Sequence, residues 1–109
     1  MPKKYKIQFM DLAIKDIAEI TDYIADVLSA PQAAYDLLVK IDEAVKPLER
    51  FPFAFPVYRD AAFAKLGYRI RPVNNYLLFY VVVGNAVEIR RVIYAKRNLP
   101  ELLEQDAGL

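Results

Sequence analysis

Residues 68–94 read YRIRPVNNYLLFYVVVGNAVEIRRVIY, and this stretch decides the fold. Aromatic and β-branched residues dominate it, and Asn74-Asn75 and Gly84-Asn85 interrupt it with residues that tolerate the positive φ of tight hairpins. The pattern predicts three strands in quick succession, over Tyr68–Val73, Tyr76–Val83 and Val87–Tyr94. The second of them is apolar on both faces, so we expect it in the interior of the sheet, covered on each side.

The residues before this stretch predict one strand and two helices. Lys4–Phe9 alternates apolar and polar residues with a period of two, which indicates a strand. Across Leu12–Leu28 the apolar residues recur at helical spacing. A second amphipathic helix is predicted to begin at Pro31 and to end or kink near Lys46, because Pro47 removes a backbone donor and clashes with the preceding turn.

The predicted order of elements is β-α-α-β-β-β, an α+β fold in a single domain over residues 1–109. We expect an antiparallel sheet in which the last three strands form a meander and the first strand lies at one edge. The short link between the helices predicts an antiparallel hairpin packed on one sheet face. Arg50–Ala64 combines aromatics with prolines and is expected to be an ordered loop, while Leu99–Gln105 is a candidate helical turn anchored by Leu102 and Leu103.

The composition excludes several classes of chemistry. The chain of 109 residues has no cysteine and no histidine, so disulfides, zinc sites of the usual kind and Ser-His-Asp catalysis are excluded. We expect no metal and no cofactor. No signal peptide and no run long enough to span a membrane is apparent, so we expect a cytoplasmic protein without membrane contact.

Charge is distributed unevenly along the chain. Residues 7–49 hold nine acids and three lysines, whereas residues 59–97 hold eight Lys/Arg and two acids. Such asymmetry suggests a surface for an anionic partner, although the two halves could equally attract each other.

Strand alternation predicts how the cations are arranged. On the last strand one face is expected to carry Val87, Ile89, Arg91 and Ile93, and the other Glu88, Arg90, Val92 and Tyr94. We expect an open sheet face that binds nucleic acid or a target, made of Arg69, Arg71, Arg90 and Tyr94 and rimmed by Lys65, Lys96 and Arg97. The alternative is an ordinary solvated face whose cations prevent aggregation at the sheet edge.

The same face offers candidate catalytic residues. RNA cleavage without metal needs a base, a cation for the phosphorane and an acid for the leaving group. Arg90 is the candidate cation and Tyr94 the candidate proton donor, while Glu88 is the single acid in the three strands. Four acids of the first helix, Asp16, Glu19, Asp22 and Asp26, are spread over its exposed face, and we do not expect them to bind metal.

Several short motifs resemble, in their order along the chain, those of the RelE/ParE superfamily of type II toxin–antitoxin toxins. The resemblance extends from Tyr5 to about Leu103 and is carried by Asp11-Leu12, ITDYI at 20–24, LERFP at 48–52, Gly67-Tyr68-Arg69, NYLLFY at 75–80 and IRRVIYAKRN at 89–98. Each motif alone is of low specificity, but the order and spacing of all of them together are fairly specific.

The resemblance implies a toxin domain that inhibits growth, stabilises plasmids and is neutralised by a cognate antitoxin wrapped around it. We expect the antitoxin segment to combine apolar anchors with acidic residues and to cover the sheet face and part of the helical surface. ParE-like members inhibit DNA gyrase, whereas RelE-like members enter the ribosome and cut messenger RNA as metal-independent endoribonucleases.

One departure from the superfamily pattern bears on the choice between these activities. RelE-like nucleases carry an arginine early in the middle strand, where this chain has Leu77. We therefore expect a ParE-like gyrase inhibitor, with a ribosome-dependent messenger RNA endoribonuclease as the alternative. A non-toxic nucleic-acid-binding module is a second alternative.

Overall fold

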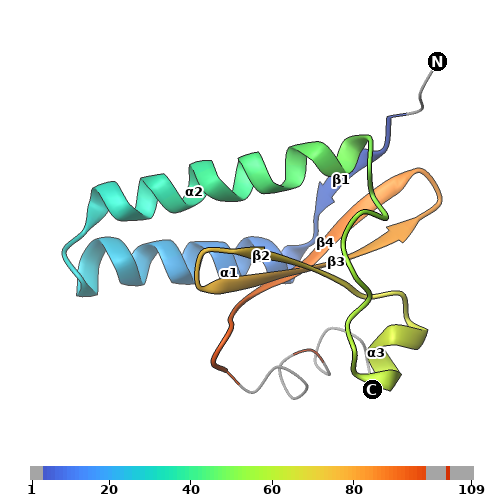
Figure 1. Ribbon diagram of the computed structural model, residues 1–109. Helices are drawn as coiled ribbons and strands as arrows, with labels where there is room; N and C mark the ends of the chain where they lie inside the picture. Colours follow the sequence, from blue (N-terminus) through green and yellow to red (C-terminus); the bar gives the residue numbers. More distant parts are fainter. Residues whose placement is uncertain (1–3, 98–102, 104–109) are drawn as a thin grey trace.

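The computed structural model describes residues 4–97 and Leu103, and its helices and strands follow the predicted order with one addition (Figure 1). In chain order they are β1 (Lys6–Phe9), α1 (Asp11–Asp22), a π-helical segment (Tyr23–Val27), α2 (Pro31–Val45), a 3₁₀ turn (Lys46–Glu49), α3 (Ala61–Lys65), β2 (Arg69–Val73), β3 (Tyr76–Val83) and β4 (Ala86–Tyr94). The predicted α+β fold is confirmed, and α3 is the element that the sequence did not predict.

The sheet has the strand order β1-β4-β3-β2. β2, β3 and β4 form the predicted antiparallel meander, and β1 lies at the predicted edge beside β4. β1 runs parallel to β4, so the sheet is mixed rather than wholly antiparallel. The parallel pairing is possible because the helical hairpin and the meander supply a long connection between the two strands.

The two hairpin turns and the boundaries of the second helix are also confirmed, whereas the first helix changes from an α-helix to a π-helical segment at Tyr23. Asn74 has φ 52° and Gly84 has φ 58°, as expected at the two hairpin turns. Pro31 occupies the first turn of α2, where its missing N–H costs nothing. α2 ends at Val45 and gives way to the 3₁₀ turn that contains Pro47, in agreement with the predicted break near Lys46.

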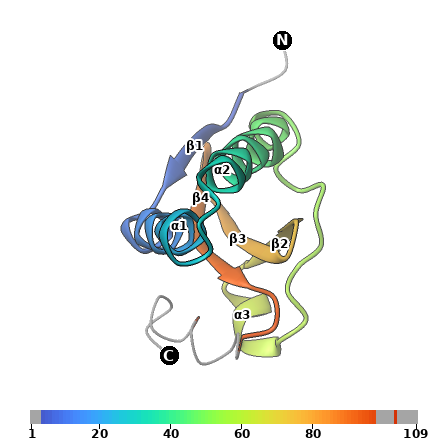
Figure 2. The ribbon, with the colours of Figure 1, turned by 90° about the vertical axis from the view of Figure 1, so that its left-hand side faces the viewer.

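The sheet separates two groups of buried side chains. α1 and α2 lie on one face and α3 lies on the other (Figures 1 and 2). The first cluster lies under the helical hairpin and includes Leu37, Leu48, Leu78 and Tyr80. The second cluster, on the opposite face, contains Tyr58, Phe63, Tyr68, Phe79, Val81, Ile93 and Leu103. The middle strand is therefore covered on both sides, as predicted. Leu103, one of the two predicted anchors, is buried in the second cluster, whereas Leu102 and the rest of the predicted turn Leu99–Gln105 lie outside the described residues.

A β-bulge corrects the predicted alternation of the last strand. Phe79 pairs with Arg91 and Tyr80 pairs with Ile89, so Arg90 is an extra residue in β4. An extra residue shifts the side-chain alternation by one position from there on. Val92 consequently lies in the first cluster beside the helices, and Ile93 lies in the second, the reverse of the prediction.

Within the part of the chain that the structure describes, none of the helices combines the length and the apolar composition needed to cross a membrane.

Candidate functional site

The second half of β4 has no strand beside it on the β1 side. β1 pairs only with the first part of β4, from Ala86 to Ile89, and the chain then leaves the sheet to form α1. α1 lies along the remainder of β4 on that side (Figure 2). A helix cannot pair with the strand through its backbone, so side chains must satisfy the edge of β4.

Asp16 of α1 satisfies this edge. Its Oδ2 accepts hydrogen bonds from the backbone N–H of Val92 at 3.0 Å and from Nε of Arg91 at 2.7 Å, and its Oδ1 accepts from Nη2 of Arg91 at 2.9 Å. The carboxylate and the guanidinium are almost completely buried, with side-chain exposures of 12% and 8%. Asp16 was expected on an exposed face, and this prediction is wrong, because the arginine and the strand edge both need an acceptor there.

A groove runs above this ion pair, between α1 and the end of β4. Its volume is 780 Å³, and its lining combines apolar, aromatic and charged side chains of both signs. Its charged and aromatic lining residues are Lys15, Asp16, Glu19, Tyr23, Tyr76, Arg91, Tyr94 and Arg97. We refer to this feature as the tyrosine groove.

Three tyrosines give the groove its character. The rings of Tyr76 and Tyr94 meet edge to face, with centroids 5.7 Å apart, and Tyr23 reaches the groove from the π-helical segment. Burial raises the pKa of Tyr76, and the nearby Tyr94 and Tyr23 raise it further. Tyr76 is therefore a neutral phenol at neutral pH, able to pack against apolar groups and to form hydrogen bonds.

The structure places Arg69 and Arg71 on the helix-facing side of β2. They pair with Tyr80 and Leu78, which belong to the first cluster. Nη1 of Arg69 donates to the carbonyl of Phe55 at 2.8 Å, and its guanidinium lies 5.1 Å from the centroid of the Phe53 ring. The Arg71 guanidinium lies 4.6 Å from the centroid of the Phe55 ring. Both arginines therefore hold the loop that precedes α3.

Arg90 and Tyr94 lie on opposite faces of the sheet. Arg90 forms an ion pair with Glu88 at 2.8 Å, and Glu88 stands beside Val81, a member of the second cluster. Tyr94 pairs with Tyr76, which packs against the first cluster. The two residues are also separated by roughly 13 Å along the strand. The predicted open face carrying both of them is therefore not formed, because the bulge at Arg90 and the strand pairing assign them to different sides.

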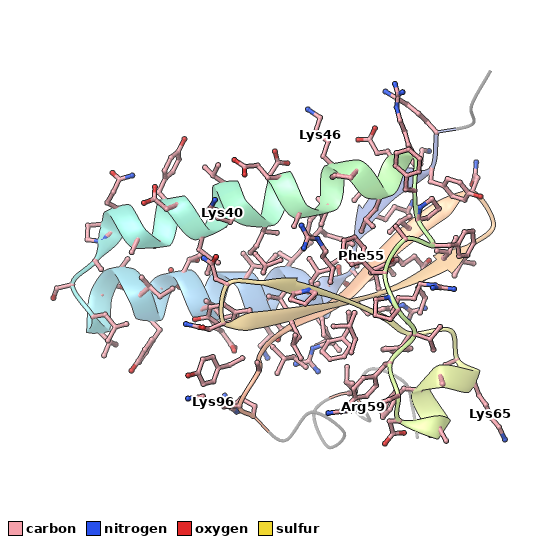
Figure 3. The ribbon with its side chains drawn as sticks, in the orientation of Figure 1. Lys40, Lys46, Phe55, Arg59, Lys65 and Lys96 are labelled. Carbon is pink, nitrogen blue, oxygen red and sulfur yellow. The ribbon has the colours of Figure 1, made fainter. Side chains whose placement is uncertain are left out.

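The predicted cationic rim is dispersed as well. Lys65 lies at the end of α3 and Lys96 lies beyond the end of β4, well apart in the view of Figure 3. Both are exposed. Arg97 alone among the three rim residues lines the tyrosine groove.

The arrangement is suited to docking rather than to acid–base catalysis. The groove offers neutral aromatic surface and charges of both signs, which a protein segment can match. Among the described residues there is no group of acids arranged to hold a metal ion. The sequence did not identify Tyr23, Tyr76 or Asp16 as site residues. One signal was available: the last predicted strand is longer than the first, so part of its edge has no partner strand and needs side chains beside it.

Comparisons with known proteins agree with this fold. A family model described as the ParE toxin of type II toxin–antitoxin system, parDE, matches residues 7–99. A chain of the chromosomal ParDE toxin–antitoxin system from P. aeruginosa superposes with a TM-score of 0.71 at 22% identity, covering 85% of this chain and 98% of that chain. A chain of the toxin–antitoxin complex RelBE2 from Mycobacterium tuberculosis superposes with a TM-score of 0.58 at 18% identity, covering 88% and 98%. A search of curated proteins found no significant match.

Proposed function

The chain belongs to the ParE toxin family of type II toxin–antitoxin systems, and we propose that it stops growth by inhibiting DNA gyrase rather than by cutting messenger RNA. The main support for this proposal is that Arg90 and Tyr94 lie apart, on opposite faces of the sheet. A nuclease needs its cation and its proton donor on the same phosphodiester, and these two side chains face opposite sides of the sheet.

Two further observations support the same function. Leu77, at the position where RelE-like nucleases carry an arginine, is packed against the second cluster, so its side chain serves the core. Arg69 and Arg71 are engaged with the Phe53 and Phe55 rings. The remaining cations therefore do not form the cluster that a developing phosphorane requires.

The substitution Tyr94→Phe distinguishes gyrase inhibition from messenger RNA cleavage. The substitution keeps the ring that meets Tyr76 and removes only the hydroxyl, so inhibition of gyrase supercoiling is expected to stay within about twofold of the wild type. The measurement is a supercoiling assay with purified toxin and gyrase, together with mapping of messenger RNA 5′ ends during induced growth arrest. New 5′ ends at fixed codon positions that disappear in Tyr94→Phe would establish the nuclease and refute the gyrase proposal.

We further propose that the antitoxin places a segment in the tyrosine groove. The groove offers apolar and aromatic side chains, including Tyr23 and Tyr94, that such a segment would bury, and Lys15 and Arg97 can pair with its acids. Neutralisation would then use side-chain contacts, because Asp16 already occupies the edge N–H of Val92.

Tyr23→Ala tests this placement. Tyr23 is 53% exposed, so the change should leave the fold intact while weakening antitoxin binding by roughly tenfold or more, as for an aromatic interface residue. Tyr35→Ala is the matched control, since Tyr35 is a similarly exposed tyrosine of α2, at 62%, and does not line the groove. Calorimetric titration of toxin with antitoxin gives the comparison, and equal affinities for the two variants would refute the placement.

A further inference from the structure

The loop from Arg50 to Arg59 has a fixed conformation although it contains almost no regular structure. The hydroxyl of buried Tyr80 donates to the carbonyl of Pro52 at 2.7 Å, and Arg69 donates to the carbonyl of Phe55 at 2.8 Å. Val57 forms an isolated bridge with Arg69. Backbone bonds from Ile70 to Pro56 and from Tyr58 to Tyr68, at 3.1 and 2.8 Å, attach its second half to the start of β2. These hydrogen bonds attach the loop to the ordered strands β2 and β3, so the loop is preorganised.

This rigid loop presents apolar side chains to solvent. Phe51 is 65% exposed, Phe53 is 58% exposed and Val57 is 43% exposed. Scattered exposed apolar residues are common, but here three of them lie within seven residues of one preorganised loop. The Phe53 ring contacts Tyr5 and Arg69 on the toxin, but more than half of each of the Phe51 and Phe53 side chains remains exposed, and a partner that covers them would bury this apolar area.

The two charged residues within the loop are both positive. The segment 50–59 reads RFPFAFPVYR and contains no acid and no lysine. The acids that flank it are engaged elsewhere: Glu49 lies 3.7 Å from Lys4, and Asp60 accepts from the backbone N–H of Ala62 at 3.1 Å. Arg50 and Arg59 are exposed and form no ion pair with any described residue. These two arginines therefore favour a partner that offers acidic residues.

The side-chain chemistry favours a protein over a nucleic acid. Aromatic residues and arginine, with few lysines and acids, are typical of the central residues of protein interfaces. A platform for stacking bases needs free ring faces, whereas the rings of Phe53 and Phe55 already have a guanidinium against them. Preorganisation also lowers the entropy cost of docking on a partner protein.

We propose that the loop Arg50–Arg59 is the surface through which the toxin docks on its target protein, and that the target offers an acidic surface with an apolar pocket for Phe51 and Phe53. This inference rests on the proposed function, in which the target is gyrase. It gives the toxin two separate surfaces, the tyrosine groove for its antitoxin and the loop for its target.

Two variants test the loop in complementary ways. The double change Phe51→Ala and Phe53→Ala removes the apolar anchors, and Arg50→Glu with Arg59→Glu reverses the charge without removing a ring. Each is expected to weaken binding to gyrase, and inhibition of it, by roughly tenfold or more. Antitoxin affinity should stay unchanged, which also shows that the variants are folded. Tyr35→Ala and Lys40→Glu are the matched controls for the aromatic and the charge change, since both residues are exposed on α2; Figure 3 labels Lys40.

The outcomes distinguish the two proposals. If the wild type does not inhibit gyrase but still stops growth, the proposed function fails, and growth arrest by the loop variants then tests the loop on its own. If the folded loop variants inhibit gyrase or stop growth as the wild type does, the loop proposal fails. Tight binding of single-stranded DNA or RNA by the wild type, lost in Arg50→Glu with Arg59→Glu while gyrase binding persists, would also overturn it.

Discussion

Replacing Asp16 with alanine is expected to lower the free energy of unfolding by about 3–5 kcal/mol, the loss typical of breaking a buried ion pair. The change leaves the Arg91 guanidinium buried without its carboxylate and leaves the N–H of Val92 without its acceptor. Since small domains are stable by only about 5–15 kcal/mol, most of the stability would be lost. Urea denaturation followed by circular dichroism measures the change.

Two variants show whether the ion pair is the cause. Asp22→Ala removes an exposed carboxylate of the same helix and should cost within about 0.5 kcal/mol. Combining Asp16→Ala with Arg91→Leu also removes the buried guanidinium that Asp16→Ala leaves unpaired with a carboxylate. The double variant should therefore be more stable than Asp16→Ala alone. A double variant less stable than Asp16→Ala would contradict this account.

Replacing Phe63 with alanine is expected to cost about 3–5 kcal/mol, the usual loss for a large aromatic in a core. Phe63 is the buried residue of α3, and its ring lies 5.4 Å from that of Tyr68 and 5.9 Å from that of Tyr58, between centroids. Its removal opens a cavity in the second cluster and detaches the short helix that covers this face. Thermal unfolding detects the loss as a lower Tm.

Leu66→Ala is the control for this prediction. Leu66 lies at the end of the same helix but is exposed, so its truncation should change stability by about 0.5 kcal/mol or less. Equal losses for Phe63→Ala and Leu66→Ala would mean that α3 contributes through its helical conformation and not through the second cluster.

Most of the fold could be predicted because its patterns are local. Hydrophobic periodicity indicated the strands and the two long helices, and Pro47, Asn74 and Gly84 indicated where they end. α3 escaped prediction because five residues are too few to show a helical period. Its start depends on Asp60 capping the N–H of Ala62, within a loop dominated by aromatics and prolines. The parallel direction of β1 depends on a connection through the whole chain, which no local signal reports.

The site was harder to predict than the fold. Residue types suggested the arginines and Tyr94, but the face on which each lies depends on pairing. One extra residue at Arg90 reverses every assignment that follows it in β4. The role of Asp16 depends on Arg91, which is 75 positions away in the sequence, and no spacing rule connects them.

The pairing of β1 with β4 also has a consequence for synthesis of the toxin. Lys6 lies opposite Ala86, so the first strand has no neighbour in the sheet until the last one has been made. Asp16 likewise gains its partner only when Arg91 has left the ribosome. Contacts between such distant residues form late, after most of the chain is available. The tyrosine groove, which needs both α1 and the end of β4, is therefore absent from every nascent chain that ends before β4, and an antitoxin that binds there can recognise only a toxin whose translation has passed Arg97.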